Sequence, residues 1–177
     1  MRRAKKRGLP VTCEVTPHHL LLCEDDIKSD DGKYKMNPPL RSAIDRQALW
    51  DGVCDGTIEC IATDHAPHTA EEKARGLLKS AMGIVGLETA FAVSRTALGG
   101  KIAPERLLAM LGENPRRVLG RPVPENDWVL LDWDAPVTVD PQAFFSRGKS
   151  TPFAGMALQG RVVMTIRGGI VIYDGLC

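Results

Sequence analysis

Residues 57–63, with the sequence TIECIAT, restrict the fold more than any other part of this chain. They form an almost continuous apolar run of strand length, which is typical of a strand buried on both faces of a parallel sheet. Because parallel strands are joined by crossover connections, usually helices, this strand predicts a fold in which strands and helices alternate. The run ends abruptly at Asp64, so polar side chains are expected at the end of a buried strand.

The segments on either side support this alternation. Residues 10–23 and 34–40 are predicted to contain strands, because they are rich in β-branched and apolar residues. A helix is expected to begin at Ser42, where Ser42 and Asp45 form a capping-box pattern, and to end near Gly56. Its apolar face is predicted to include Ile44, Ala48 and Val53.

Later segments divide into two kinds. Apolar residues recur at helical spacing from Gly83 to Leu98, and residues 104–111 form a second predicted helix that opens with proline. Residues 122–177 are instead short strands with Gly and Asp turns, including a hairpin signal at Gly168-Gly169. We therefore expect an α/β part at 1–121 and a β-rich part at 122–177.

The α/β part holds about three strand–helix units. Either a barrel or a doubly wound sheet is built from such units. A closed eight-stranded barrel typically needs roughly 250 residues, so this chain is not expected to close one by itself.

Composition argues against several classes of partner. The net charge of +1 gives no general attraction to nucleic acid or membrane. The sequence contains no apolar stretch of roughly 18 residues and no secretory signal. Its five cysteines form no CxxC pair, which fits a reducing cytoplasm, and Cys13, Cys54 and Cys60 are expected to be small buried side chains.

The first seven residues are strongly basic. They fit the last turns of a helix closed by Gly8, where cations suit the negative end of the helix dipole. A nucleic-acid or targeting patch is the alternative. A domain that begins in the final turn of a helix is expected to have lost what came before.

The candidate chemistry is concentrated at Asp64, His65 and His68. In barrel folds, the carboxyl end of a strand is where catalytic groups are displayed. Asp64 could bind a metal through oxygen, and either histidine could bind through nitrogen. In the alternative interpretation, Asp64 caps the following turn and the histidines are ordinary loop residues.

Three weaker candidates lie nearby. His18 and His19, on a predicted strand, would point to opposite faces, so at most one could face a common site. Asn37 ends a predicted strand and could bind a polar ligand or serve as a turn residue. The Gly83–Gly86 pair, ahead of a helix, could cradle an anion or allow tight packing.

Several linked motifs resemble one family. The stretches EVTPHHLLL (14–22), KMNPPLR (35–41), ATDHAPH (62–68) and GIVGLETAF (83–91) resemble class I dihydroorotases of the amidohydrolase superfamily, in this order and spacing. The tail NPRRVLG (114–120) and the run at 149–175 fit the same family. The resemblance covers essentially the whole chain.

The resemblance implies a fold and an activity. The fold is the C-terminal part of a (β/α)8 barrel, followed by a β-rich segment of a small sandwich. The activity is the interconversion of N-carbamoyl-L-aspartate and dihydroorotate in pyrimidine synthesis. A zinc pair holds the attacking hydroxide, lowers the pKa of the bound water and polarises the carbonyl.

Residue by residue, the resemblance implies that Asp64 binds one zinc ion and shuttles a proton to the leaving nitrogen. It implies that His68 and Asn37 hold the substrate and that Gly83 lies near the ring. His18, His19 and His65 receive no catalytic role. The family's other metal ligands are expected upstream of Met1, so the chain is expected to be inactive alone.

Two alternatives remain open. One is a non-catalytic dihydroorotase-like partner of aspartate transcarbamoylase, and the other is a hydantoinase or allantoinase. The strand at residues 10–16 is expected to present an open edge, so the isolated chain is expected either to self-associate into a homo-oligomer or to need its missing half.

Overall fold

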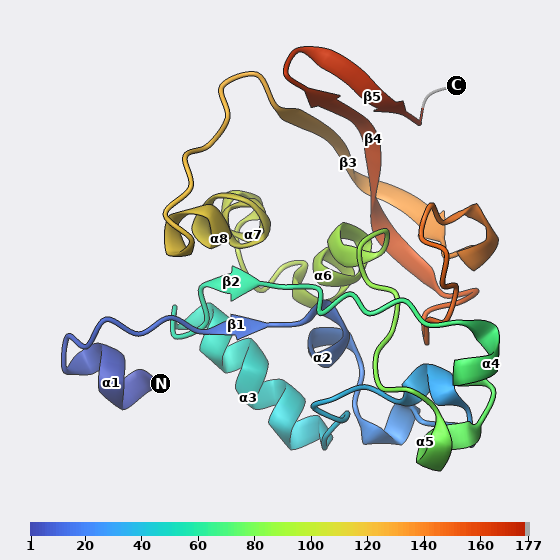
Figure 1. The fold of residues 1–177 in the computed structure, drawn as a ribbon. Coiled ribbons are helices and arrows are strands. Elements are labelled where there is room, and N and C mark those ends of the chain that lie inside the picture. Colours follow the sequence, from blue (N-terminus) through green and yellow to red (C-terminus); the bar gives the residue numbers. More distant parts are fainter. Residues whose placement is uncertain (176–177) are drawn as a thin grey trace.

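The computed structural model describes residues 1–175, which form a mixed α/β fold (Figure 1). Two short parallel strands, β1 (Glu14–Val15) and β2 (Cys60–Ile61), lie side by side, with Val15 opposite Ile61. A parallel bridge between His65 and Ile84 brings a further extended segment beside the continuation of β2. The predicted alternation of strands and helices is confirmed, although both strands are shorter than their apolar runs.

Eight helices lie within residues 1–121. The longest is α3 (Ala43–Cys54), which follows Ser42 with the predicted capping box to Asp45. The others are α1 (Arg2–Lys6), α2 (Pro17–Leu21), α4 (Ala70–Lys73), α5 (Gly76–Lys79), α6 (Ala90–Leu98), α7 (Pro104–Leu111) and α8 (Glu113–Val118). Short 3₁₀ turns lie at η1 (Glu24–Asp26), η2 (Gly32–Tyr34) and η3 (Pro141–Ala143).

Two hydrophobic clusters fill the interior. The first joins both parallel strands to α2, α3, α6 and α7, and includes Leu20, Val53 and Leu107. The second joins α6 to the C-terminal sheet, and includes Val93, Phe153 and Leu158. Helix α6 contributes to both clusters, so it connects the parallel strands with the sheet.

The C-terminal region is a three-stranded antiparallel sheet in the order β3 (Trp128–Thr138), β4 (Ala157–Arg167) and β5 (Ile170–Asp174). The predicted hairpin at Gly168-Gly169 is confirmed, and both glycines have positive φ. Strand β4 packs against α6, whereas β5 is exposed along its length and extends away from the rest of the chain (Figure 1).

Some local predictions are wrong. Residues 10–23 form a two-residue strand and then helix α2, because the Thr16 hydroxyl accepts the His19 N–H and Pro17 occupies the first helical position. Residues 34–40 form no strand, and the 3₁₀ turn η2 ends at Tyr34, the first of them. Ile44, expected on the apolar face of α3, is 82% exposed because that side of the helix faces away from the core.

The remaining local predictions are confirmed in part. The basic N-terminus does form a helix, α1, in which Arg2 and Lys5 pair with Asp55 and Glu59. Cys60 is buried and Cys13 is partly buried, but Cys54 is exposed at the end of α3. Cys177 lies outside the described residues. None of the helices within residues 1–175 has the length and apolar character needed to cross a membrane.

Candidate functional site

Asp64 lies just beyond the carboxyl end of β2, as the sequence predicts. Its side chain is exposed, and its φ of +50° is the only positive φ among the described non-glycine residues. Aspartate tolerates this left-handed conformation better than most residues, at a typical cost of about 1 kcal/mol or more. The backbone therefore turns sharply at the residue whose carboxylate carries the predicted chemistry.

An open cavity of about 670 Å³ begins at this turn. Its wall includes Asp64, the end of β1 at Val15, and Asn37, which is 27 positions earlier in the chain than Asp64. The first turns of α3 complete the wall. The fold thus brings two of the predicted site residues, from separate motifs, to one cavity at the carboxyl ends of the parallel strands.

His19 also lines the cavity. Its Nε2 atom lies 3.1 Å from the Pro38 carbonyl oxygen, and its Nδ1 atom lies 2.6 Å from the Thr16 hydroxyl. The carbonyl can only accept, so Nε2 carries the proton and Nδ1 accepts from Thr16. His19 thereby ties α2 to the residue that follows Asn37.

His18 has a different environment from its neighbour. It is buried, its ring lies 4.4 Å from that of His19, and its Nε2 has no hydrogen-bond partner among the described residues. Burial, with a smaller contribution from His19, lowers the pKa of His18 to about 3. His18 is therefore a neutral core residue, and only His19 faces the cavity.

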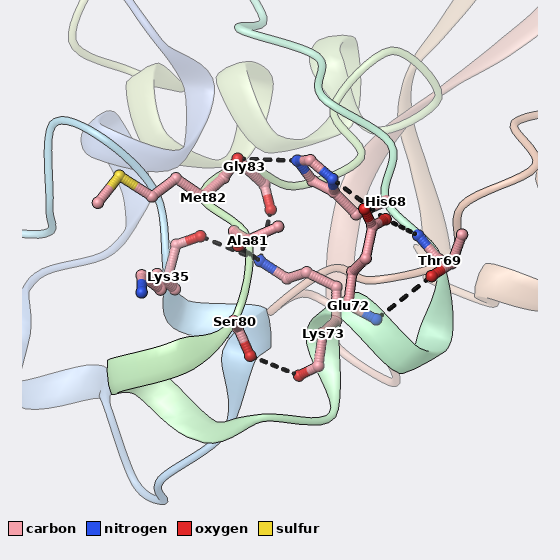
Figure 2. A network of polar contacts seen from close by, with 9 residues as sticks. All are labelled: Lys35, His68, Thr69, Glu72, Lys73, Ser80, Ala81, Met82 and Gly83. Atoms are coloured by element: carbon pink, nitrogen blue, oxygen red, sulfur yellow. Dashed lines mark hydrogen bonds and ion pairs between the residues drawn. The ribbon is translucent and has the colours of Figure 1, made fainter.

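His68 and Gly83 lie close together on two neighbouring segments and do not line this cavity. The His68 Nε2 donates to the Met82 carbonyl at 2.9 Å, and its Nδ1 lies 3.5 Å from the Glu72 carboxylate (Figure 2). The Gly83 N–H donates to the Lys35 carbonyl at 3.0 Å, and the Gly83 carbonyl accepts from Lys73. Both polar backbone groups of Gly83 are therefore engaged within the chain.

Close packing explains the glycines at 83 and 86. A Cβ added at Gly83 would lie 2.4 Å from the Ala66 Cβ, and one at Gly86 would lie 3.0 Å from the Thr63 carbonyl oxygen. The packing alternative for this motif is thus supported. Helix α6 begins only at Ala90, so its amino end does not coincide with these glycines.

His65 holds the same segment from the other side. Its Nδ1 atom accepts N–H groups from Gly86 at 3.2 Å and Leu87 at 3.3 Å. An atom that accepts carries no proton, so the neutral ring is protonated at Nε2. This arrangement gives His65 a structural task that its position in the sequence did not reveal.

Other charged side chains, none of them predicted as a site residue, also surround the cavity. Arg41 belongs to the KMNPPLR motif and lines the wall, as do Glu14 and Asp45. Hydrogen bonding from Ser42 lowers the pKa of Asp45 and keeps this carboxylate ionised. The sequence did contain one indication that Arg41 lies at the site, because Arg41 belongs to the same motif as Asn37.

The described residues do not fit a complete metal centre. Within residues 1–175, no three His, Cys, Asp or Glu side chains come together in a group that could hold a metal ion. A zinc site needs at least three protein ligands in most catalytic cases. The histidines nearest to Asp64 in sequence, His65 and His68, are instead hydrogen-bonded to backbone groups of residues 82, 86 and 87.

The comparisons with known proteins agree with this geometry. A comparison with protein-family models finds no match. Among solved structures, the L-hydantoinase (dihydropyrimidinase) of Arthrobacter aurescens superposes with a TM-score of 0.87, at 32% identity, over 98% of this chain and 41% of its own. An inactive dihydroorotase-like domain of a Chaetomium thermophilum CAD-like multifunctional protein shares the fold at a TM-score of 0.75 and 23% identity, over 98% of this chain and 47% of its own. The fold is thus that of the amidohydrolases which act on cyclic amides.

Sequence relatives are more specific. The dihydroorotase of Fusobacterium nucleatum is 49% identical over 98% of this chain and 43% of its own length. The dihydroorotase of Bacillus cytotoxicus is 49% identical over 98% of this chain and 42% of its own. By sequence the chain is similar to dihydroorotases over nearly all of its own length, and it spans less than half the length of these relatives.

Proposed function

We propose that this chain supplies the proton-transfer and substrate-holding side of a dihydroorotase site. The observation that carries the proposal is the convergence of Asp64 and Asn37 on one cavity at the ends of parallel strands. The 49% identity to named dihydroorotases supports the same activity. The reaction would be the interconversion of N-carbamoyl-L-aspartate and dihydroorotate, the cyclic-amide step of pyrimidine synthesis.

The proposed mechanism assigns one step to Asp64. In hydrolysis, water adds to the ring carbonyl, the C–N bond breaks, and the leaving nitrogen must gain a proton. A carboxylate at the mouth of the cavity can accept the proton from water and give it to that nitrogen. Its exposed position on a sharp turn leaves the oxygen atoms accessible.

Substrate binding is assigned to Asn37 and His68, with Gly83 giving close approach of the backbone. Because the backbone groups of Gly83 are engaged with Lys35 and Lys73, and its Cα packs against Ala66, its contribution would be the close packing of the segment that holds His68. The substrate is anionic, and the Arg41 guanidinium in the cavity wall suits a carboxylate.

Zinc is proposed as the metal of the complete site. Of the described residues, Asp64 is the ligand that this chain would contribute, since no group of three ligands exists within residues 1–175. We also propose that residues 1–121 form the last units of a (β/α)8 barrel. Residues 122–177 would be the β-rich segment of a composite sandwich.

The test uses two proteins. The 177-residue chain alone, with added zinc, should contain no stoichiometric metal and should not hydrolyse dihydroorotate. A chimera in which this chain replaces the matching segment of the Fusobacterium nucleatum dihydroorotase should hydrolyse it. Asp64→Asn in the chimera should lower kcat by roughly 10²–10⁴-fold, the range for a lost acid–base group.

Other outcomes identify other functions. A chimera that prefers hydantoin over dihydroorotate would support a hydantoinase, for which the 32% identity to the L-hydantoinase is the favouring observation. A folded, zinc-loaded chimera without turnover of either substrate would support a non-catalytic partner, for instance of aspartate transcarbamoylase. Turnover by the isolated chain would refute the assignment of the remaining ligands to residues outside it.

A further inference from the structure

A buried lysine lies behind the substrate-side residues. Lys73, the last residue of α4, is only 5% exposed. Its ammonium group donates to three backbone carbonyls, those of Gly83 at 2.7 Å, Ala81 at 2.8 Å and Lys35 at 3.1 Å (Figure 2). An ammonium has three N–H donors, so every donor has a partner.

Packing alone does not explain why a lysine is buried at position 73. No carboxylate lies within ion-pair distance of its ammonium among residues 1–175. Burying a cation without a carboxylate partner is costly, and an apolar side chain of similar length would fill the same space at lower cost. The burial also lowers the pKa of Lys73, with a smaller contribution from Lys35. An apolar side chain, however, cannot donate hydrogen bonds to the three carbonyl oxygens.

The three carbonyls belong to the segments that carry the proposed substrate-binding residues. Lys35 is two positions before Asn37, and its carbonyl also accepts the Gly83 N–H. Ala81 and Gly83 flank Met82, whose carbonyl accepts from His68. Lys73 therefore fixes the backbone on both sides of the His68 acceptor and joins it to the Asn37 segment.

From this arrangement we infer that Lys73 is a positioning residue, which sets the relative placement of Asn37, His68 and Gly83 by holding the carbonyls of residues 35, 81 and 83. The inference rests on the proposed function for its meaning in catalysis. The three hydrogen bonds from Lys73, which we call the clamp, are a property of the folded chain. They can be tested without turnover or metal.

Nuclear magnetic resonance of the labelled 177-residue chain tests the clamp. In Lys73→Met, the Gly83 amide should exchange about 10- to 100-fold faster, as for a lost hydrogen bond to a charged group. The Val93 amide, which donates to Thr89 within α6, should keep its rate. The matched control is Lys79→Met, which removes an exposed lysine from α5 and should leave both rates unchanged.

A second signal reports on positioning. In the parent chain, the His68 Nε2 proton should exchange slowly with solvent, because Nε2 donates to the Met82 carbonyl at 2.9 Å. Lys73→Met should abolish this signature and speed the exchange, since the Met82 carbonyl is no longer fixed. Faster exchange at Gly83 and Val93 together, with the His68 signature retained, would reduce Lys73 to a general stability residue and overturn the inference.

If Lys73→Met does not fold, the parent chain alone still tests the inference. Ammonium protons held by three carbonyls in a buried site should exchange slowly enough to be observed at neutral pH, unlike those of Lys79. Rapidly exchanging Lys73 protons in a chain whose 81–83 amides are protected would overturn it. Neither result depends on dihydroorotate, so failure of the clamp and failure of the proposed activity are separately visible.

Discussion

The imidazole of His19 joins Thr16 to Pro38, with Nδ1 2.6 Å from the Thr16 hydroxyl and Nε2 3.1 Å from the Pro38 carbonyl oxygen. This bridge connects the amino end of α2 to the residue after Asn37. It is placed at the wall of the cavity that Asp64 also lines. The imidazole thus supports the loop that presents a proposed substrate-binding residue.

Removal of this bridge should be measurable. His19→Ala is expected to lower the free energy of unfolding by about 1–2 kcal/mol, because two hydrogen bonds are lost at a partly exposed site. Urea unfolding of His19→Ala, Thr16→Val and the double variant gives the coupling between the two side chains. Additive effects would mean that the Thr16–His19 contact contributes nothing beyond the role of Thr16 as helix cap.

The glycine at position 83 is predicted to be required by packing as well as by backbone conformation. Gly83→Ala would place a Cβ 2.4 Å from the Ala66 Cβ at a φ of +125°. The free energy of unfolding should fall by about 2–4 kcal/mol, from left-handed strain and overlap together. Chemical denaturation measures this difference.

A matched glycine separates the two effects. Gly100 has a φ of +75°, and a Cβ added there would meet nothing within 4 Å. Gly100→Ala should therefore lower stability by about 1 kcal/mol, from conformational strain alone. Equal losses at the two positions would contradict the packing argument for Gly83.

The buried His18 should make stability depend on pH. Its pKa is about 3 in the folded chain and near 6.5 when unfolded, so the unfolded state binds more protons between these values. Stability should therefore be full above pH 6.5 and decline as pH falls toward 3. The decline from this group alone should be about 2 kcal/mol between pH 7 and pH 5.

An apolar ring at the same position provides the comparison. His18→Phe should unfold with a shallower dependence on pH across this interval, because the group that gains a proton on unfolding is gone. Denaturant titrations at pH 7, 6 and 5 for both proteins give the two slopes. Identical slopes would assign the pH dependence to other groups and leave His18 without this role.

Features fixed by near neighbours could be predicted from the sequence. The capping box of Ser42 and Asp45, the helix Pro104–Leu111 and the Gly168-Gly169 hairpin all depend on contacts within a few residues. Helix α2 was not predicted, because the β-branched and apolar content of residues 10–23 is typical of a strand, whereas Pro17 also suits the first turn of a helix.

The site was predictable only in part, for a similar reason. The position of Asp64 at a strand end follows from the apolar run before it. The shared cavity with Asn37 depends on tertiary contacts across 27 positions. Nothing in the sequence indicated that Lys73 is buried or what it binds. Lysines are normally exposed, and its three acceptors are backbone atoms 8, 10 and 38 positions away.

The contact between α6 and the C-terminal sheet should depend more on packing than on its ion pair. The Arg95 guanidinium lies over the Trp133 ring at 4.8 Å and pairs with Asp134 at 3.0 Å. The side chain of Arg95 is 12% exposed, whereas that of Asp134 is 83% exposed. An ion pair with one partner in water is worth little, while a cation over an aromatic ring with a buried stem is worth more.

Two alanine substitutions therefore should differ. Arg95→Ala is expected to lower the free energy of unfolding by about 1–3 kcal/mol, through loss of the ring contact and of stem packing. Asp134→Ala should change it by less than about 0.5 kcal/mol. Urea unfolding at low and high salt checks the assignment, since the Arg95 effect should persist when ion pairs are screened. If the two variants lose equal stability, and both losses vanish at high salt, the ion pair rather than Trp133 holds the sheet against α6.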